Sequence, residues 1–274
     1  MPVSRFGPYE VVAPLASGGM GGVYLAAHVK TGERVALKVM DRRFVDHAEV
    51  VARLYGERAV SARASHPGLV DIRAAARDAD DVPYLVMEYL EGETLAAIRA
   101  RGELDVDDVT QIGAQIASAL AALHAAGFVH CDVKPDNVLV LPDGRIKIID
   151  FGVSRRVDEP PAEDSSIAGT PAYMAPEQWR GEPEPASDVY ALGCMLFELL
   201  TGETPFDGSL PKLMWAHLEQ RAPRPSWLRT GIAPQLERAV TRALAKEAAD
   251  RPTMEDLARE LGALGYRTSV RLSA

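Results

Sequence analysis

Two short segments combine residue types that suit phosphoryl transfer. Residues 130–137 contain Asp132, Lys134 and Asn137, and residues 150–152 place Asp150 beside a flexible glycine. Transfer of a phosphoryl group from a metal-bound nucleotide needs a carboxylate that orients a hydroxyl, a cation for the phosphate and oxygen ligands for magnesium. For any one of these residues alone, a capping or turn role is the simpler explanation. Their joint spacing instead favours chemistry.

A glycine-rich stretch near the N-terminus is a candidate phosphate-binding loop. Glycines let backbone amides approach a phosphate without interference from a Cβ atom. The stretch lacks a Gly-Lys-Ser/Thr ending, which excludes a Walker-type loop, and taken alone it also fits a plain flexible hairpin. The residues expected to contact the nucleotide here are Leu15, Ala16, Ser17, Gly18, Gly19, Met20, Gly21, Gly22 and Val23.

These segments resemble the signature motifs of the protein kinase family. The resemblance covers roughly Tyr9 to Leu264 and is closest to the bacterial eukaryotic-like kinases, judged by the Gly-Gly-Met-Gly loop and the Ala-Pro-Glu-Gln run that ends at Gln178. It implies a serine/threonine protein kinase that uses ATP and Mg²⁺ and acts on protein substrates with Ser or Thr acceptors. Two positions depart from the commonest pattern, because Ala16 replaces a glycine and Cys131 replaces an arginine.

The resemblance assigns the phosphate-binding lysine to the run Val35-Ala36-Leu37-Lys38. By itself Lys38 would be an ordinary surface lysine on a strand. In the family, this lysine holds the α- and β-phosphates and pairs with a glutamate of the following helix. Glu57 is the expected partner, and Glu49 is the alternative.

The segment from Leu85 to Gly92 resembles the strand that leads into the hinge between two lobes. Backbone groups of Glu88 and Leu90 would bond adenine, with Met87 at the back of the pocket. Apolar contacts to the base would come from Val23, Ala36 and Leu139. Without the other motifs, Met87 would simply be a core residue.

The resemblance also assigns the catalytic roles. Asp132 would orient the substrate hydroxyl and accept its proton late in the reaction, since aspartate is too weak a base to deprotonate an alcohol outright. Lys134 would neutralise the transferred phosphoryl group, and Thr170 would bond both of these residues. The magnesium ligands would be Asn137 and Asp150.

Further residues receive structural roles by resemblance. Glu177 would form an ion pair with Arg251, and Asp188 would anchor the backbone of the catalytic loop. His130 would pack beneath Phe151, and proton transfer by its imidazole is the alternative. The other histidines show no ligand-like spacing, so no zinc site is expected.

Cys131 bears on regulation. In many kinases an arginine at this position pairs with a phosphorylated residue of the activation loop, and cysteine cannot form that pair. We therefore expect activity that does not depend on such a phosphate. Ser165 and Ser166 remain candidate phosphosites, Arg155 and Arg156 could supply substitute charge, and redox sensing by Cys131 is the rival of a buried, inert thiol.

Two other functions compete with a protein kinase. A pseudokinase would use the fold as a binding scaffold, but a scaffold has no chemical need for Lys38, Asp132, Asn137 and Asp150 together. A small-molecule phosphotransferase would not need the Thr170–Glu177 segment, which resembles a platform for protein substrates.

Composition and charge exclude several classes of protein and partner. The chain has 274 residues, 47% of them hydrophobic, and a formal net charge of -9, which argues against nucleic acid as a partner. The longest apolar run, Ala191 to Phe197, is too short to cross a bilayer, no secretory signal is evident, and the two cysteines give no disulfide framework. We expect a cytoplasmic protein with no membrane segment in this chain; its oligomeric state, and whether it is a stand-alone enzyme or a catalytic fragment, stay open.

Patterning predicts an α+β chain that is rich in strands in its first part and helical beyond it. The resemblance then implies one kinase domain over residues 1–274, with a β-rich N-lobe (about 9–88), a hinge (88–92) and a helical C-lobe (about 93–264). Predicted strands are residues 11–15, 22–29, 34–40, 69–76, 83–87, 139–141 and 145–149. Predicted helices are residues 44–64, 106–126, 187–200, 210–220, 234–245 and 253–262. Residues 150–177 lack periodicity, which is typical of a functional loop.

Overall fold

The structure, a computed structural model, describes residues 5–158 and 169–265, and the chain divides into two compact units. The N-terminal unit comprises Met1–Ser65, Leu69–Glu91 and Asp150–Gly152. The C-terminal unit comprises His66–Gly68, Gly92–Ile149 and Val153–Ala274. The first is built around a sheet and the second mainly from helices, so the predicted α+β class is confirmed.

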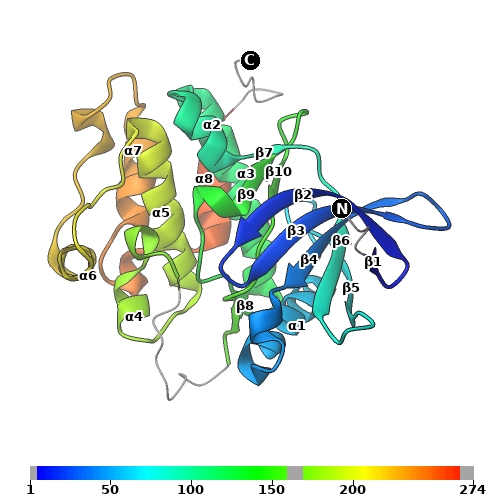
Figure 1. The fold of residues 1–274 in the computed structure, drawn as a ribbon. Helices are drawn as coiled ribbons and strands as arrows, with labels where there is room; N and C mark the ends of the chain where they lie inside the picture. Colours follow the sequence, from blue (N-terminus) through cyan, green and yellow to red (C-terminus); the bar gives the residue numbers. More distant parts are fainter. Residues whose placement is uncertain (1–4, 159–168, 266–274) are drawn as a thin grey trace. The chain divides into compact units, whose positions relative to one another are not determined.

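An antiparallel sheet forms the N-terminal unit (Figure 1). Its six strands lie in the order β1-β2-β3-β4-β6-β5. They are β1 (Arg5–Phe6), β2 (Tyr9–Gly18), β3 (Gly21–His28), β4 (Arg34–Met40), β5 (Ile72–Arg77) and β6 (Pro83–Glu88). Strands β2 and β3 extend further toward each other than predicted, so the glycine-rich stretch is a hairpin whose turn is only Gly19 and Met20.

Alternation along β4 separates the two faces of this sheet. Val35, Leu37 and Val39 are buried on one face, in a core that also contains Ala26, Val82, Tyr84 and Val86. Ala36 and Lys38 therefore point to the other face. Val23 is directly opposite Lys38 in the register and Met87 is directly opposite Ala36, so these four side chains share one face.

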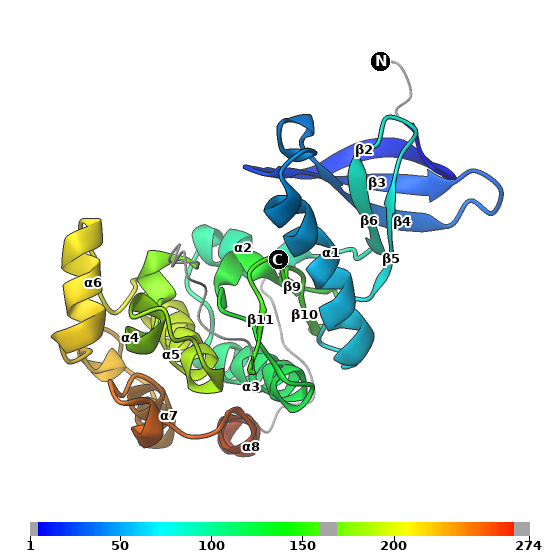
Figure 2. The same ribbon diagram turned by 90° about the horizontal axis from the view of Figure 1, so that it is seen from below.

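Helix α1 (Ala48–Arg63) packs against β5 and β6 within the same unit (Figure 2). Its buried positions are Val51, Leu54, Glu57 and Val60. The predicted start of this helix at Phe44 was wrong. Residues Arg42–Phe44 instead form a single 3-10 turn that Asp41 caps, because its carboxylate accepts a hydrogen bond from the Arg43 amide.

Helices dominate the C-terminal unit. They are α2 (Leu95–Arg101), α3 (Val106–Ala125), α4 (Pro176–Trp179), α5 (Pro185–Thr201), α6 (Leu210–Glu219), α7 (Pro234–Ala243) and α8 (Met254–Leu264). Helix α5 is buried from Ser187 to Leu200 and packs against α3 and α7 (Figure 1). A helix that is apolar on nearly every side must be surrounded by other elements, so α5 is the centre of this core.

Short strands complete the C-terminal unit. Strands β7 (Glu93–Thr94), β9 (Val138–Val140) and β10 (Ile146–Ile148) form one small sheet, and β8 (Phe128–Val129) pairs with β11 (Arg155–Arg156). The hairpin predicted around Pro142-Asp143-Gly144 is confirmed by the pairing of β9 with β10. The 3-10 turn Pro135–Asn137 and this hairpin hold the C-terminal end of the loop of residues 130–137.

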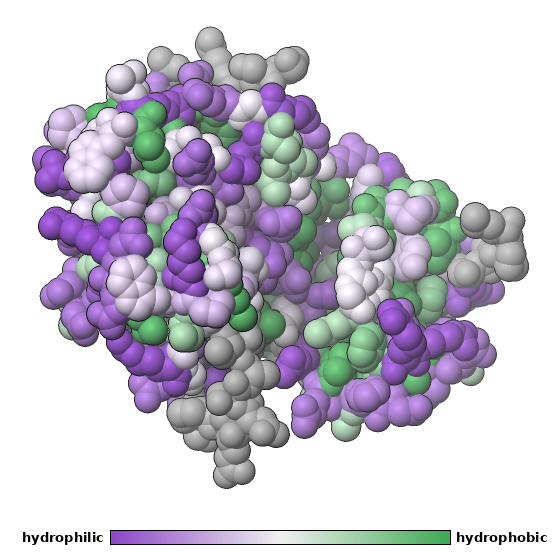
Figure 3. Space-filling view, turned by 60° about the vertical axis from the view of Figure 1, so that its left-hand side comes forward, coloured by the Kyte–Doolittle hydropathy of each residue, from purple (hydrophilic) through white to green (hydrophobic). Residues whose placement is uncertain are grey.

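The surface mixes residue types. Exposed apolar side chains on α6 are Leu210, Met214 and Trp215. On the face shown in Figure 3, hydrophobic residues are interspersed with hydrophilic ones rather than gathered into one continuous area. Across residues 5–158 and 169–265, every helix is too short or too polar to pass through a bilayer.

Candidate active site

Three charged residues predicted for the site meet within the N-terminal unit. Lys38 Nζ on β4 lies 2.7 Å from Glu57 Oε1 on α1 and 2.9 Å from Asp150 Oδ1. Lys38 thus pairs with the expected glutamate. The alternative partner Glu49 was wrong, because it lies exposed in the first turn of α1.

Burial and charge oppose each other in this group. Desolvation disfavours the ammonium of Lys38, but the charges of Glu57 and Asp150 outweigh it and raise the lysine pKa. Burial raises the pKa of Glu57 to about 7, although Lys38 counteracts the effect. The Asp150 carboxylate is 42% exposed and its Oδ1 also accepts a hydrogen bond from the Gly152 amide.

The glycine hairpin is open to solvent and rigid at one point. Residues 15–20 are exposed, whereas Gly21 has a φ of +155° and lies against β4. A Cβ atom at Gly21 would collide with the carbonyl oxygen of Val39, while one at Gly19 would meet nothing within 4 Å. The sequence therefore needs glycine at position 21 to keep β3 close to its neighbour, and the tip of the hairpin stays accessible.

The predicted adenine-binding segment ends strand β6. Met87 is 5% exposed and lies beside Ala36, as the register requires. The Glu88 amide donates to the Asp71 carbonyl, at 2.9 Å. Because the Glu88 amide is used in this bond, the backbone group of Glu88 that can bond adenine is its carbonyl.

The catalytic candidates of the C-terminal unit form one cluster around Asp132. Its Oδ1 accepts a hydrogen bond from Thr170 Oγ1 at 2.7 Å, and its Oδ2 lies 2.8 Å from Lys134 Nζ. Lys134 also donates to Thr170 at 2.8 Å. Asn137 Nδ2 donates to both the Asp132 carbonyl and its Oδ2, at 2.9 and 3.1 Å. Both carboxylate oxygens of Asp132 are thus held in direction.

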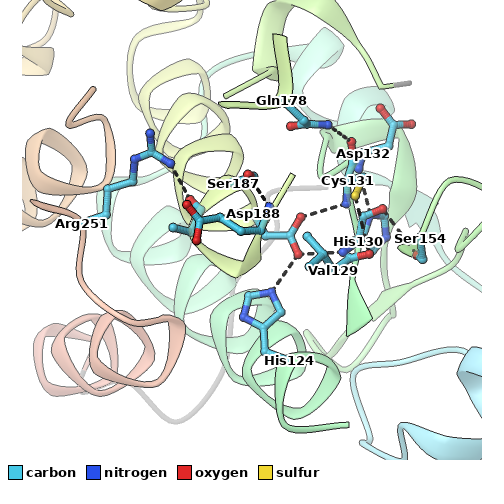
Figure 4. A network of polar contacts seen from close by, with 12 residues as sticks. His124, Val129, His130, Cys131, Asp132, Ser154, Gln178, Ser187, Asp188 and Arg251 are labelled. Carbon is cyan, nitrogen blue, oxygen red and sulfur yellow. Dashed lines mark hydrogen bonds and ion pairs between the residues drawn. The ribbon is translucent and has the colours of Figure 1, made fainter. Parts of the chain in front are cut away.

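Asp188 of α5 fixes the backbone of this loop (Figure 4). Its Oδ2 accepts from the His130 amide at 2.8 Å and its Oδ1 from the Cys131 amide at 2.9 Å. His124 Nε2 also lies 2.8 Å from Oδ2. Burial would raise the pKa of Asp188, but the contacts with His124 and His130 hold it below its usual value. The predicted anchoring role of this aspartate is confirmed.

The predicted ion pair between Arg251 and Glu177 is also present. The two Arg251 nitrogens Nη1 and Nη2 donate to Glu177 Oε1 and Oε2 at 2.6 and 2.9 Å. Ser187 donates to Glu177 Oε1 at 2.6 Å. Both charged side chains are buried, and the bidentate geometry compensates for their desolvation.

Cys131 is buried, and burial together with Asp188 raises the pKa of its thiol. The Sγ atom lies 3.7 Å from the Val129 carbonyl. Redox sensing needs an accessible thiolate, so these observations favour the inert thiol. His130 is fully buried and its Nδ1 accepts from the Asp132 amide, which favours packing over proton transfer to solvent.

The sequence assigned no role to two polar residues that support the loop, one directly and one through Asp188. Gln178 Nε2 donates to the Cys131 carbonyl at 2.6 Å, and His124 holds Asp188. Gln178 is a polar residue of the buried helix α4, and this burial could be seen only in the structure. The candidate phosphosites Ser165 and Ser166 lie outside the described residues.

The predicted site residues therefore form two groups. Lys38, Glu57, Asp150 and residues 88–91 of the predicted hinge belong to the N-terminal unit, and Asp132, Lys134, Asn137 and Thr170 to the C-terminal unit. Leu139, predicted to contact adenine, lies half-buried on β9 of the C-terminal unit.

Comparison with known proteins identifies the family. Residues 9–261 match the protein kinase domain. The serine/threonine-protein kinase PknL of Mycobacterium tuberculosis is 40% identical over 247 residues, which cover 89% of this chain and 62% of that protein. Pkn1 of Myxococcus xanthus, also a serine/threonine-protein kinase, is 39% identical over 258 residues, covering 90% of this chain and 36% of its own length. The chain thus spans less than two thirds of these relatives. Since the domain match extends over nearly the whole sequence, this chain belongs to the protein kinase domain family.

Proposed function

We propose that this chain transfers the γ-phosphoryl group of ATP to Ser and Thr hydroxyls of proteins. The observation that carries the proposal is the restraint of Asp132 by Thr170, Lys134 and Asn137. A carboxylate held at both oxygens can present a fixed lone pair to a hydroxyl, which is the positioning that phosphoryl transfer needs. The relatives' names, all serine/threonine-protein kinases, support the choice of acceptor.

Each residue then has a role in the reaction. Asp132 orients the acceptor hydroxyl and takes its proton as the phosphoryl group leaves the nucleotide. Lys134 balances the negative charge of that group, and Thr170 holds the side chains of Asp132 and Lys134 in place by hydrogen bonds to both. In the N-terminal unit, Lys38 holds the α- and β-phosphates while Glu57 fixes the direction of its ammonium.

The residues present fit Mg²⁺. Asn137 Nδ2 is committed to Asp132, so the amide oxygen is the atom left to face a cation. Asp150 supplies a half-exposed carboxylate, and carboxylate and amide oxygens are ligands that Mg²⁺ prefers. Mg²⁺ usually completes its coordination shell with substrate phosphates and water. When bound, the ion neutralises charge on the β- and γ-phosphates.

Turnover on a generic protein acceptor tests the proposal. The wild-type chain should incorporate phosphate from labelled ATP with Mg²⁺, and mass spectrometry should place it on Ser and Thr. Asp132→Asn should lower kcat by at least about 10²-fold, because the acceptor proton loses its base, while calorimetry shows ATP binding nearly unchanged. Asp143→Asn removes an exposed carboxylate from a turn of the same unit and should leave kcat intact.

The alternatives predict other outcomes. A pseudokinase would bind ATP without turnover, and a small-molecule phosphotransferase would turn over only with small acceptors. An Asp132→Asn variant that retains the wild-type rate would contradict the assignment of the base. The cytoplasmic location stays a prediction.

A further inference from the structure

Cys131 holds a backbone conformation that non-glycine residues rarely adopt. Its φ is +66°, and among the described residues only Asp81 shares a positive φ without being glycine. Such a conformation is strained and persists only where the surroundings hold it in place. Cys131 directly precedes Asp132, so the contacts that hold it also set the direction of the proposed base.

The two sides of this backbone are held by different elements (Figure 4). On the amide side, Asp188 of α5 accepts from the Cys131 N–H. On the carbonyl side, Gln178 of α4 donates from Nε2 at 2.6 Å. The peptide that joins Cys131 to Asp132 is also bonded at its N–H, which donates to His130 Nδ1 at 3.2 Å. The plane of this peptide is therefore fixed at both edges.

Gln178 also connects the segment of residues 169–178 to the loop. It is 6% exposed, and its Oε1 accepts from the Ala175 amide at 3.4 Å. Gly169 lies against the same bond, because a Cβ atom there would be 2.8 Å from the Cys131 carbonyl and 3.0 Å from Gln178 Nε2. The neighbouring Thr170 bonds Asp132. The segment that carries residues 169–178 thus reaches the loop at two points, through Thr170 and through Gln178.

We propose that Gln178 is a positioning residue that holds the Cys131–Asp132 peptide in its active orientation through an uncharged, permanent hydrogen bond. This inference rests on the proposed function. An arginine at position 131 would take its restraint from a phosphate, whereas the buried thiol of Cys131 offers no charge to pair. The amide of Gln178 is present whether or not the chain is phosphorylated, so the orientation of Asp132 does not depend on phosphorylation.

A matched residue separates positioning from simple stabilisation. Gln115 on α3 also bonds backbone groups on both sides of its amide: it donates to the Gly144 carbonyl at 3.1 Å and accepts from the Ile146 amide at 3.2 Å. Both bonds support the β9–β10 turn rather than the loop that carries Asp132. Replacing either glutamine by methionine keeps the length of the side chain and removes both bonds.

The test compares Gln178→Met with Gln115→Met in phosphatase-treated enzyme, well below the melting temperature of each. Gln178→Met should lower kcat roughly tenfold while the KM for ATP stays within about twofold, because a buried carbonyl loses its donor beside the base. Gln115→Met should lower Tm by a similar amount and leave kcat within about twofold of wild type. Equal kcat losses in both variants, or none in Gln178→Met, would overturn the proposal.

A second variant uses pH as the readout. Gln178→Glu can donate to the Cys131 carbonyl only when its carboxyl is protonated, and burial should raise its pKa. The ratio of its kcat to that of wild type should therefore increase as pH falls from about 9 to about 6. A ratio that does not change with pH contradicts the positioning role, and this comparison also decides the matter if Gln178→Met is recovered unfolded.

Hydrogen exchange distinguishes failure of this inference from failure of the proposed function. The amides of residues 130–132 should exchange faster in Gln178→Met than in wild type or Gln115→Met, a result that needs no turnover. If the wild-type chain proves inactive on proteins, the proposed function fails, while the exchange data still test whether Gln178 holds the loop. Unchanged exchange in Gln178→Met would sink the inference alone.

Discussion

Lys38 Nζ lies 2.7 Å from Glu57 Oε1, and the pKa of that buried glutamate is raised to about 7. Protonation of Glu57 removes the negative charge that directs the lysine. The pair is therefore intact above pH 7 and weakens as pH falls through that value. We expect kcat/KM for ATP, which reports the free enzyme, to fall over the same range.

Glu57→Gln should abolish this dependence and lower kcat/KM at pH 8 to the level that wild type reaches in acid, since glutamine cannot titrate. Glu49→Gln, on the exposed first turn of the same helix, should keep the wild-type profile. The measurement is kcat/KM from pH 6 to 9 for the three proteins. Identical profiles for Glu57→Gln and wild type would mean that another group titrates.

The bidentate pair between Arg251 and Glu177 predicts a large stability effect. Arg251→Ala leaves Glu177 buried without its counter-charge, and this should lower the free energy of unfolding by about 3–5 kcal/mol. Arg259→Ala removes a surface arginine that pairs with Glu255 and Asp256 on α8, and it should cost no more than about 1 kcal/mol. Urea denaturation measures both. A loss below about 1 kcal/mol for Arg251→Ala would show that the pair contributes little.

His217 predicts that the fold loses stability in acid. The imidazole is fully buried, its Nδ1 lies 3.0 Å from Tyr190 Oη, and burial together with Lys246 lowers its pKa to about 4. Lys246 Nζ donates to the same hydroxyl oxygen at 3.3 Å, so the tyrosine proton is directed to Nδ1 and the neutral ring is favoured.

The change of stability with pH follows from proton linkage. An unfolded histidine binds its proton near its ordinary pKa of about 6.5, whereas His217 resists protonation until about pH 4. Its contribution to stability is complete above pH 6.5 and is lost toward pH 4, by about 3 kcal/mol in total. Urea titrations between these values should show a slope that His217→Phe removes and that the exposed His47→Gln retains. A persistent slope in His217→Phe would assign it to carboxylates.

The uncharged restraint of Cys131 predicts activity without activation-loop phosphate. The double variant Ser165→Ala/Ser166→Ala should keep kcat within about threefold of wild type, because the bond that Cys131 accepts from Gln178 and the bond that it donates to Asp188 both form without a phosphate. The measurement is the kcat of the double variant and of wild type, the latter both before and after phosphatase treatment. Loss of most of the activity in the double variant would contradict the hypothesis.

Long periodic segments could be predicted from the sequence because their burial pattern is local. Helices α3 and α5 and strand β4 lie within one or two residues of their predicted ranges. Helix α2 escaped prediction because it is short and buries only Leu95 and Ile98. Two-residue strands such as β8 and β11 depend on partners distant in the sequence, so no local pattern of apolar residues predicts them.

The same distinction holds at the site. Asp132, Lys134 and Asn137 could be proposed from their close spacing, and the contact of Lys38 with Glu57 from the family resemblance. The hydrogen bond from Gln178 to Cys131 joins residues 47 positions apart, and it depends on the backbone direction of a single strained residue. Such contacts are set by packing in three dimensions, which spacing along the chain does not record.

Both cysteines of this chain, Cys131 and Cys194, are buried. The folded molecule thus hides both thiols from maleimides, and fluorophores or spin labels can be attached at engineered surface cysteines without first deleting the native ones. One label on each unit would then allow interprobe distances to be recorded while nucleotide is added, on an otherwise unaltered background.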